Sequence, residues 1–444
     1  MLINFTIENW MSYQTKSRFT MVASKEQQHG ERLTRLGKYR LRILPTAAIY
    51  GGNASGKTNF FKAINFAKHY ILRGALPEAI IPVDPFILNQ NSRKHPSKFT
   101  FEILIGNDIY EFLFAVTATK VIEERLIKVS STSEKILYHR QDNNPDPNFH
   151  VSIQNQRLKY AFEGTRENQL FLTNSISQKI DTFRDIYNWF AQTLVLVAPD
   201  TRFDSFEHFV TEGSPLYEAI NTILPNLDTG ICHLGGEDIS LDSIQIPEAL
   251  KQKIKEDVKN NISIKINDKD EKIIVSRHDD ELSVKKLYTY HKDSTGKNIR
   301  FEMKQESDGS KRIIDLLPAF LELVDIKAAK VYIIDEIDRS LHSLLTQQLL
   351  NIYLSSCNNT TRKQLLFTTH DLMLMNQSFF RRDEMWITER KQDGSSELIS
   401  ISEYADIRND KDIRKSYIQG RMGGIPHIIE NQILNVPKVP GSPE

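Results

Sequence analysis

The stretch TAAIYGGNASGKT, residues 46–58, decides the fold of this chain. It begins with a short apolar run typical of a buried strand, and the apolar residues that follow it recur at the spacing of a helix. Between the two lies the pattern G-x-x-x-x-G-K-[ST], formed by Gly51, Gly56, Lys57 and Thr58. The order strand, glycine loop and helix predicts a phosphate-binding loop.

The chemistry of this loop follows from its backbone. Glycine lets the chain curl so that successive N–H groups face a phosphate, and the helix N-terminus adds its positive end. We expect Lys57 to bridge the β- and γ-phosphates of ATP and the Thr58 hydroxyl to ligate Mg²⁺. The residues predicted to contact ATP here are Gly51, Asn53, Ala54, Ser55, Gly56, Lys57, Thr58 and Asn59. The alternative, a glycine turn without nucleotide, is weakened by the strand and helix on either side.

A second apolar strand, within KVYIIDE (Lys330–Glu336), ends in two acids. Asp335 is expected to hold Mg²⁺, and Glu336 to orient or deprotonate the attacking water. A solvated acidic helix cap is the plain alternative. Lys57 and Asp335 are 335 − 57 = 278 residues apart, so a sizeable segment must be inserted between the two motifs.

Composition excludes several classes of protein. The 444 residues hold 57 Lys+Arg against 57 Asp+Glu, so the chain is not basic throughout, although a local basic face stays open. Cys232 and Cys357 are too few and too far apart for a disulfide framework or a zinc knuckle. The N-terminus alternates like a strand, unlike a signal peptide, and no stretch reaches the roughly 18–20 apolar residues of a membrane span. We therefore expect a soluble, cytoplasmic protein without a membrane partner.

Alternating residues predict β-structure near the phosphate loop. Leu2–Ile7 and Arg18–Val22 predict an antiparallel opening, and residues 98–140 predict a further antiparallel layer. Residues 142–148 are typical of a loop. The region from about 168 to 259 mixes helical stretches with a glycine-rich break, which indicates a partly helical insertion.

The stretch EMKQESDGSKR, residues 302–312, precedes a predicted helix whose apolar face is formed by Ile313, Ile314, Leu317, Phe320, Leu321 and Val324. Here the sequence resembles the ABC-type ATPase heads, in which a Ser-Gly-Gly signature opens a helix that faces the γ-phosphate bound by the opposite subunit. Ser307 and Gly309 match the signature residues that contact this phosphate, and Asp308 replaces the usual first glycine. As an isolated string, SDGS is a common turn, so the prediction rests on its place before the helix and the acidic strand.

Further positions continue this resemblance. DRSLH (Asp338–His342) stands where such heads carry the D-loop, with His342 in place of the usual aspartate. His370, at the end of LLFTTH, matches the switch histidine that reaches the γ-phosphate; a structural histidine is the alternative. Gln90, in PFILNQN, is the candidate Q-loop residue and Mg²⁺ ligand, although glutamines in polar loops are ordinarily solvated.

The whole set of motifs resembles one branch of these ATPases, the bacterial AAA-15 type of phage defence, similar to the RloA-like and abortive-infection ATPases and to the AriA subunit of the phage anti-restriction-induced system. The match covers roughly residues 1–120 and 300–430, in the stretches MLINFTIENWMSY, AAIYGGNASGKTNFFKA, ESDGSKRIIDLLP, YIIDEIDRSLH, LLFTTHD, RRDEMW and YIQGRMGGIP.

This resemblance implies the fold class and the division of the chain. The fold is expected to be α/β, an ABC-type P-loop ATPase head with an antiparallel β layer and a partly helical insertion between Walker A and the signature motif. Residues 1–162 and 301–444 would form the head, and residues 163–300 an inserted region for dimerisation or partner binding.

The resemblance also implies a switch shared between subunits. Such heads split the site between Lys57 of one subunit and Ser307 of the other, which requires a homo-oligomer, a dimer or larger. ATP would join the subunits, and hydrolysis, with Glu336 and His370 as catalytic residues, would release them. Members of this branch are typically encoded beside a separate effector, often a Toprim-like nuclease. The expected function is an ATP-dependent sensor that controls such an effector, with a phage protein as its trigger.

Two other functions are compatible with a phosphate-binding loop. A DNA-binding maintenance ATPase similar to the RecF and SMC heads is disfavoured, because residues 123–301 show no sustained heptads and mix charges of both signs. DNA nevertheless stays an open partner. A scaffold with an inactive nucleotide site is disfavoured because the residues required for chemistry are present, namely Lys57, Thr58, Asp335, Glu336 and His370.

Four acidic or glycine-rich stretches have no role in the predicted site. DKDEK (Asp268–Lys272) and HDDE (His278–Glu281) are typical of solvated turns and form no convincing nuclease site. RRDEMW (Arg381–Trp386) and YIQGRMGGIP (Tyr417–Pro426) match further patterns of the branch without an evident physical role. The arginines of these stretches could act at the phosphate bound by the partner subunit or form a structural ion pair, and the ion pair is favoured.

Overall fold

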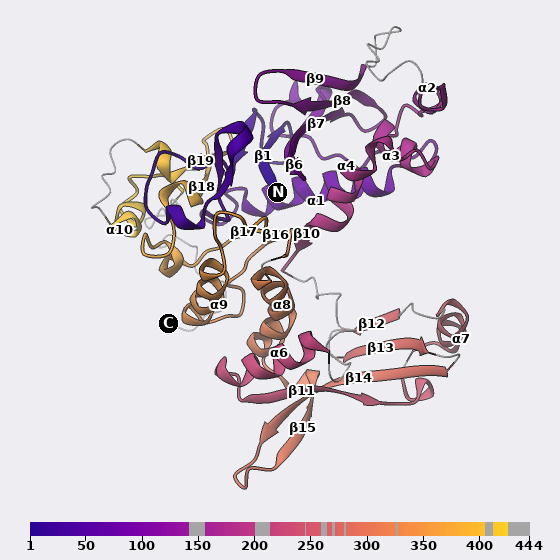
Figure 1. Ribbon diagram of the computed structural model, residues 1–444, viewed down its shortest axis with the longest axis vertical. Helices are drawn as coiled ribbons and strands as arrows, with labels where there is room; N and C mark the ends of the chain where they lie inside the picture. The colour runs from indigo at the N-terminus through magenta and orange to yellow at the C-terminus, as the bar shows by residue number, and fades with distance from the viewer. Residues whose placement is uncertain are drawn as a thin grey trace, which may run out of the picture.

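Two six-stranded sheets build a head, and a five-stranded sheet builds an arm at one end of the molecule (Figure 1). Helix α8 (Asp308–Val324) lies between the head and the arm. The computed structural model describes residues 1–141, 156–199, 214–244, 246–258, 264–268, 271–278, 281–325, 327–404 and 412–424. Its mixed α/β architecture with antiparallel sheets confirms the predicted fold class.

The central sheet of the head carries both chemical motifs. Its strands, in spatial order, are β10 (Leu194–Val197), β16 (Val331–Ile334), β17 (Gln364–Thr368), β5 (Thr46–Tyr50), β18 (Met385–Arg390) and β19 (Ser396–Ser400). The first five strands are parallel, and β19 is antiparallel to β18. Because parallel strands end at the same edge, the loops that follow β5, β16 and β17 meet there.

Strand β5 is packed on both faces. Ala47 and Ile49 belong to the core that contains helix α1 (Lys57–Arg73), while Ala48 and Tyr50 belong to the core that contains α8 and helix α9 (Ser343–Ser355). This alternation is the two-residue period of a strand between two layers. The phosphate loop therefore leaves a strand that is fixed from both sides.

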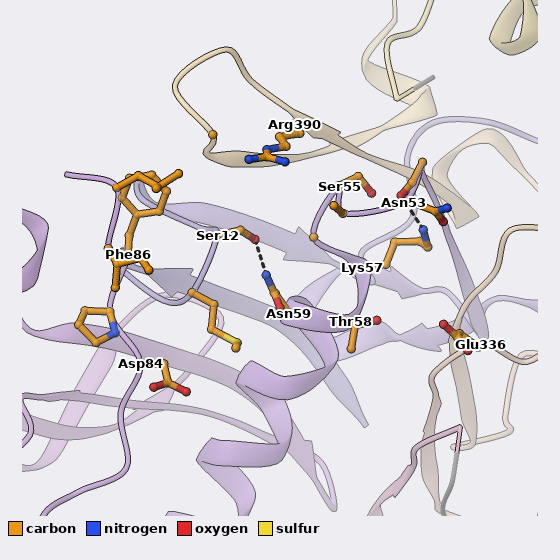
Figure 2. Close-up of a pocket in the computed structure, with 18 of the residues that line it drawn as sticks. Ser12, Asn53, Ser55, Lys57, Thr58, Asn59, Asp84, Phe86, Glu336 and Arg390 are labelled. Carbon is orange, nitrogen blue, oxygen red and sulfur yellow. Dashed lines mark hydrogen bonds between the residues drawn. The ribbon is translucent and has the colours of Figure 1, made fainter. Parts of the chain in front are cut away.

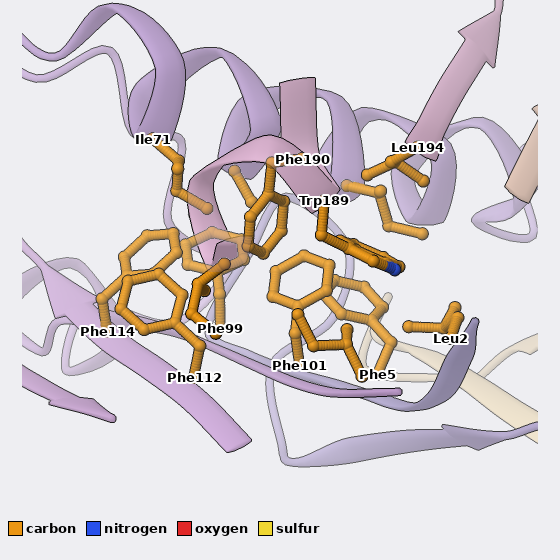
Figure 3. Close-up of a cluster of buried hydrophobic side chains, with 14 of the residues drawn as sticks. Leu2, Phe5, Ile71, Phe99, Phe101, Phe112, Phe114, Trp189, Phe190 and Leu194 are labelled. Atoms are coloured by element: carbon orange, nitrogen blue, oxygen red, sulfur yellow. The ribbon is translucent and has the colours of Figure 1, made fainter. Parts of the chain in front are cut away.

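The second sheet of the head is antiparallel, as the sequence predicts. In spatial order it contains β2 (Ser17–Thr20), β1 (Leu2–Glu8), β6 (Ser97–Ile105), β7 (Asp108–Val116), β8 (Val121–Val129) and β9 (Glu134–Gln141). Aromatic side chains fill the space between this sheet and α1 (Figure 3). The rings of Phe99 and Phe114 stack 5.1 Å apart, and Phe101 meets Phe190 edge-on at the same separation.

The arm, residues 214–302, is a separate antiparallel sheet with two helices. It consists of α6 (Pro215–Ile223), β11 (Ile231–Asp238), α7 (Glu248–Asp257), β12 (Ile264–Asp268), β13 (Glu271–His278), β14 (Glu281–Lys292) and β15 (Asn298–Glu302). DKDEK and HDDE thus fall at two hairpins of the arm, and residues 269–270 and 279–280 lie outside the described chain. The prediction of a solvated turn is wrong for Lys272, whose side chain is buried.

The arm is shorter than the predicted insertion of residues 163–300. Helices α2 (Gln156–Glu163), α3 (Phe171–Ser177) and α4 (Arg184–Asn188) pack into the core of the head, and β10 extends its central sheet. Polar contacts help to hold α3 against the head. The fully buried Glu124 of β8 accepts hydrogen bonds from the backbone N–H groups of Phe171 (2.6 Å) and Leu172 (3.0 Å) at the start of α3. Burial raises the pKa of this carboxyl group, and these donors partly offset that effect.

The remaining elements are short. They are the hairpin of β3 (Thr34–Leu36) and β4 (Leu41–Ile43) and helix α10 (Ile413–Ile418). In the described part of the chain, no helix has the length and apolar character needed to cross a bilayer. The predicted loop at residues 142–148 lies outside the described residues.

Candidate functional site

The loop after β5 has the tight geometry that its glycines predict. Gly51 and Gly56 have φ values of 155° and 116°, in the region that favours glycine. A Cβ atom at Gly51 would lie 2.3 Å from Thr388 Oγ1, and one at Gly56 would lie 2.4 Å from Ser396 Oγ. Both glycines are thus required by the close approach of the β18–β19 hairpin.

Lys57 begins α1 and turns back over the loop. Its Nζ donates to the carbonyl oxygens of Gly51 at 2.7 Å and Gly52 at 3.0 Å. Burial lowers the pKa of Lys57 to about 8, an effect that the nearby carboxylates of Asp335 and Glu336 partly offset. A phosphate anion in the loop would favour the charged amine and would compete with the two carbonyl groups.

Asp335 follows β16 and is fully buried. Its Oδ1 accepts a hydrogen bond from Thr368 Oγ1 of β17 at 2.6 Å, whereas its buried Oδ2 has no hydrogen-bond partner. A buried carboxylate oxygen without a donor is suited to bind a cation or its water shell. Asp335 does not itself line the cavity that contains Thr58, but its neighbour Glu336 does, and the charge of Asp335 acts on Lys57. These positions fit the predicted Mg²⁺ site.

Within the described residues, no cluster of three or more carboxylate, histidine or cysteine side chains gathers that would hold a metal ion. Mg²⁺ usually keeps several water ligands beside one or two carboxylates, and phosphate oxygens complete its shell in nucleotide sites.

Glu336 and His370 lie beside the phosphate loop on one cavity. The backbone of Glu336 has a positive φ of 51°, and its N–H donates to Thr368 Oγ1 at 2.8 Å. The backbone N–H of His370 donates to Asp338 Oδ2 at 3.3 Å. Partial burial and the positive charge of Lys57 lower the pKa of His370, so its imidazole is mostly neutral near pH 7.

This cavity has a volume of about 760 Å³ and two chemically different ends. Lys57, Thr58 and Glu336 lie at one end, and Phe86 lies at the other, with Arg390 above them on the β18–β19 hairpin (Figure 2). Met11, Ile87 and Leu88 add apolar surface near Phe86. A nucleotide requires such a division between a polar phosphate end and an apolar end for the base.

The tip between β1 and β2 braces the loop from outside. Asn59 Nδ2 donates to Ser12 Oγ at 2.9 Å, and Trp10 Nε1 donates to the carbonyl oxygen of Asn59 at 3.0 Å. The backbone of Ser396 donates to the carbonyl oxygen of Ser12 at 2.7 Å. The N-terminal strands therefore fix the position of the phosphate loop, a role that the sequence alone did not reveal.

The predicted signature lies on a different cavity. Ser307 is the N-cap of α8, where its Oγ accepts from the backbone N–H of Ser310 at 3.1 Å. Ser307 and Gly309 line a second cavity of about 870 Å³. A Cβ atom at Gly309 would lie 2.8 Å from the carbonyl oxygen of Ser340, so the signature packs closely on the predicted D-loop.

Not every predicted position lies at the site. Gln90 is exposed and does not line the cavity of the phosphate loop, so its role as a Mg²⁺ ligand stays a prediction without geometric support. His342, in the predicted D-loop, is the N-cap of α9, and its Nδ1 accepts from the backbone N–H of Leu344 at 3.2 Å.

The two unexplained family patterns have structural roles. Arg381 is fully buried and forms a two-pronged ion pair with Asp383, with contacts of 2.8 and 2.7 Å. This geometry supports the structural ion pair. In YIQGRMGG, the carbonyl oxygen of Gly424 accepts from the backbone N–H of Gly52 at 2.9 Å and from the Tyr417 hydroxyl at 2.8 Å. The last two residues of this pattern lie outside the described chain.

The fold, the loop after β5 and the match to a family model define a P-loop ATPase domain. A family model described as "AAA domain, putative AbiEii toxin, Type IV TA system" matches residues 47–376, and the chain belongs to this family. No curated protein matches the chain.

Solved structures of SMC heads are similar over most of the chain but at low identity. They include the "SMC head domain from Thermotoga maritima", with 14% identity and a TM-score of 0.37 over 90% of this chain and 98% of that chain. Another is the "SmcHead bound to the C-winged helix domain of ScpA", with 12% identity and a TM-score of 0.38 over 90% of this chain and 97% of that chain.

Proposed function

We propose that this protein binds and hydrolyses ATP at a site shared between two copies of the chain. The observation that carries the proposal is a single cavity lined by Lys57, Thr58 and Glu336. Directly before Glu336 stands the buried Asp335, whose charge acts on Lys57 and whose Oδ2 has no hydrogen-bond partner. Mg²⁺ bound there would neutralise charge on the phosphates. Glu336 would orient or deprotonate the attacking water, and Lys57 would hold the phosphates.

The separation of the signature from this cavity supports the shared site. Ser307 and Gly309 line a second cavity that does not include Lys57. In the proposed assembly, a nucleotide held by Lys57 in one chain meets Ser307 of a second chain. ATP would join the two copies and its hydrolysis would separate them, which makes the protein a switch.

The switch is proposed to act in bacterial defence against phage, within the AAA-15 branch that the motifs resemble. It would sense infection and control a separately encoded effector, with a Toprim-like nuclease as the expected class. The family description, which refers to a toxin of a type IV toxin–antitoxin system, supports a role of this kind.

The mass of the assembly in solution tests the shared site. Glu336→Gln with ATP and Mg²⁺ should give twice the mass of one 51.3 kDa chain by light scattering. Lys57→Ala should neither bind ATP nor assemble, whereas Lys62→Ala, an exposed lysine on the same helix, should behave as the parent protein. Ser307→Arg should bind ATP as a single chain without doubling. Normal ATP affinity in Lys57→Ala would overturn the proposed site.

The same preparation tests the partner. Co-expression with the product of the neighbouring gene should give a stable complex that contains this product. Assembly without a protein partner but with co-purified DNA would instead favour the alternative function, a DNA-maintenance ATPase.

A further inference from the structure

The arm is joined to the predicted signature without a flexible linker. Strand β15 ends at Glu302, and residues 303–305 form a single turn in which Met303 is buried in the core. The Gln305 side chain accepts from the backbone N–H of Glu302 at 2.7 Å and closes this turn. Ser307 then begins α8. A displacement of β15 must therefore move the start of α8.

Glu306, directly before the signature serine, is held by the arm. Its side chain is only 5% exposed, and a carboxylate so deeply buried requires donors. The donors come from β14: His291 Nε2 lies 2.6 Å from Glu306 Oε1, and Thr289 Oγ1 donates to the same oxygen. Thr289 is fully buried, and the ring of His291 packs against Phe301 of β15 at 4.4 Å. The backbone at the signature is thus fixed by two adjacent arm strands.

A second buried contact joins the arm to α8 farther along the helix. Lys272 of β13 forms an ion pair with Asp315 of α8, and the two side chains are 4% and 11% exposed. Buried ion pairs tolerate the loss of one partner poorly, since a charge would then remain without compensation. Two polar contacts thus tie the arm sheet to this region, one at Glu306 just before the helix and one at Asp315 within it.

The same helix contacts the backbone of Asp335 and Glu336. The buried Arg312 of α8 lies within hydrogen-bond range of the carbonyl oxygens of Asp335 at 3.4 Å and Glu336 at 3.3 Å. One continuous set of contacts therefore runs from the arm sheet through α8 to the residues at the end of β16.

We propose that the arm sets the rate of ATP hydrolysis through α8, with Glu306 and Asp315 as positioning residues. The inference rests on the proposed function and concerns its regulation. A tilt of the arm would shift Ser307 relative to the second chain and, through Arg312, would shift Glu336 relative to the nucleotide. A ligand or partner that binds one orientation of the arm more tightly would thereby alter hydrolysis at a distance.

Steady-state kinetics separate this role from nucleotide binding. Glu306→Ala and Asp315→Ala should lower kcat by roughly 10- to 100-fold, because small displacements of catalytic groups are costly. Their affinity for ATP in the single chain, which depends on Lys57, should stay within about twofold of the parent value. Glu306→Gln keeps an acceptor oxygen and should retain most of the kcat. Glu281→Ala, at an exposed position of β14, is the matched control and should leave kcat unchanged.

If a single variant folds poorly, exchanging the charges of Lys272 and Asp315 still tests the inference. Lys272→Asp alone should lower kcat, and the pair Lys272→Asp with Asp315→Lys should restore it to within a few fold of the parent value. An unchanged kcat in folded Glu306→Ala and Asp315→Ala would overturn the inference, as would a charge exchange that restores thermal stability without restoring kcat. Absence of hydrolysis in the parent protein would overturn the proposed function itself.

Discussion

At the scale of single residues, Gly56 shows how closely the phosphate loop is packed. A Cβ atom there would meet Ser396 Oγ at 2.4 Å, and the φ of 116° is unfavourable for other residues. Gly56→Ala should lower the free energy of unfolding by about 2–4 kcal/mol, from clash and backbone strain together. Thermal unfolding and ATP titration should show a lower Tm and lost affinity. Gly37→Ala, where nothing lies within 4 Å, is the control; an equal effect there would contradict this explanation.

Glu384 gives the protein a pH dependence with a definite sign. Burial raises its pKa from 4.5 to about 8. Between these values the native protein keeps a proton that the unfolded chain has released, so stability falls as pH rises, by at most about 1.4 kcal/mol per pH unit. Glu384→Gln should flatten this decline between about pH 5 and pH 8. Thermal unfolding at several pH values measures this pH dependence, with the exposed Glu134→Gln as control. An unchanged slope of stability against pH in Glu384→Gln would show that Glu384 is not its source.

The phosphate-loop residues and the acidic pair could be predicted because each motif is local: a few adjacent residues contain both the chemistry and the strand that positions it. Phe86 and Arg390 could not be predicted. They lie on the same cavity but are 390 − 86 = 304 residues apart, and only the pairing of β18 with β5 brings Arg390 there. Gln90 follows Phe86 by only four residues but is exposed and does not line the cavity, so its role as the Q-loop residue stays a prediction.

At the scale of elements, the turn before β18 is held by the buried pair of Arg381 and Asp383. Arg381 also donates to the carbonyl oxygen of Glu26, and Asp383 accepts from the backbone of Ser24. Removing either partner should cost about 3–5 kcal/mol, since the other charge stays buried. The double variant should cost clearly less than the sum, as a double-mutant cycle of thermal or urea unfolding would show. Strict additivity would mean that the two side chains act independently.

The type of an element could be predicted from the sequence, but the boundary between the arm and the head could not. The spacing of the apolar residues in α8 predicts a helix, and the alternation of apolar and polar residues predicts the strands, because both patterns follow from which side chains are buried. The place of β10 in the central sheet of the head could not be predicted. Its partner is β16, which begins at Val331, so its place depends on a pairing over more than a hundred residues and not on its own four residues.

At the scale of the whole molecule, the arm should be less stable than the head. The head is held by two large clusters, the second of which also contains inner residues of the arm such as Leu234 and Leu287. The outer part of the arm is held by a small cluster of Leu241, Ile244, Ile254, Val258, Ile273, Val275 and Val284. Hydrogen exchange should therefore be faster in β13 and α7 than in β5, β16 and β17. Strand β7 is the control, because it also lies between two neighbours but packs in a large core. Equal protection of β13 and β7 would contradict this expectation.

The position of β5 between β17 and β18 has a consequence for synthesis on the ribosome. The strand is complete at Tyr50, but both of its neighbours are made only after residue 363. At about 5–20 residues per second, β5 waits roughly 15–60 s before it can pair. During that interval an apolar strand with two open edges has left the ribosome. Newly made chains should therefore depend on chaperones, and a pause in translation before β17 should increase their aggregation.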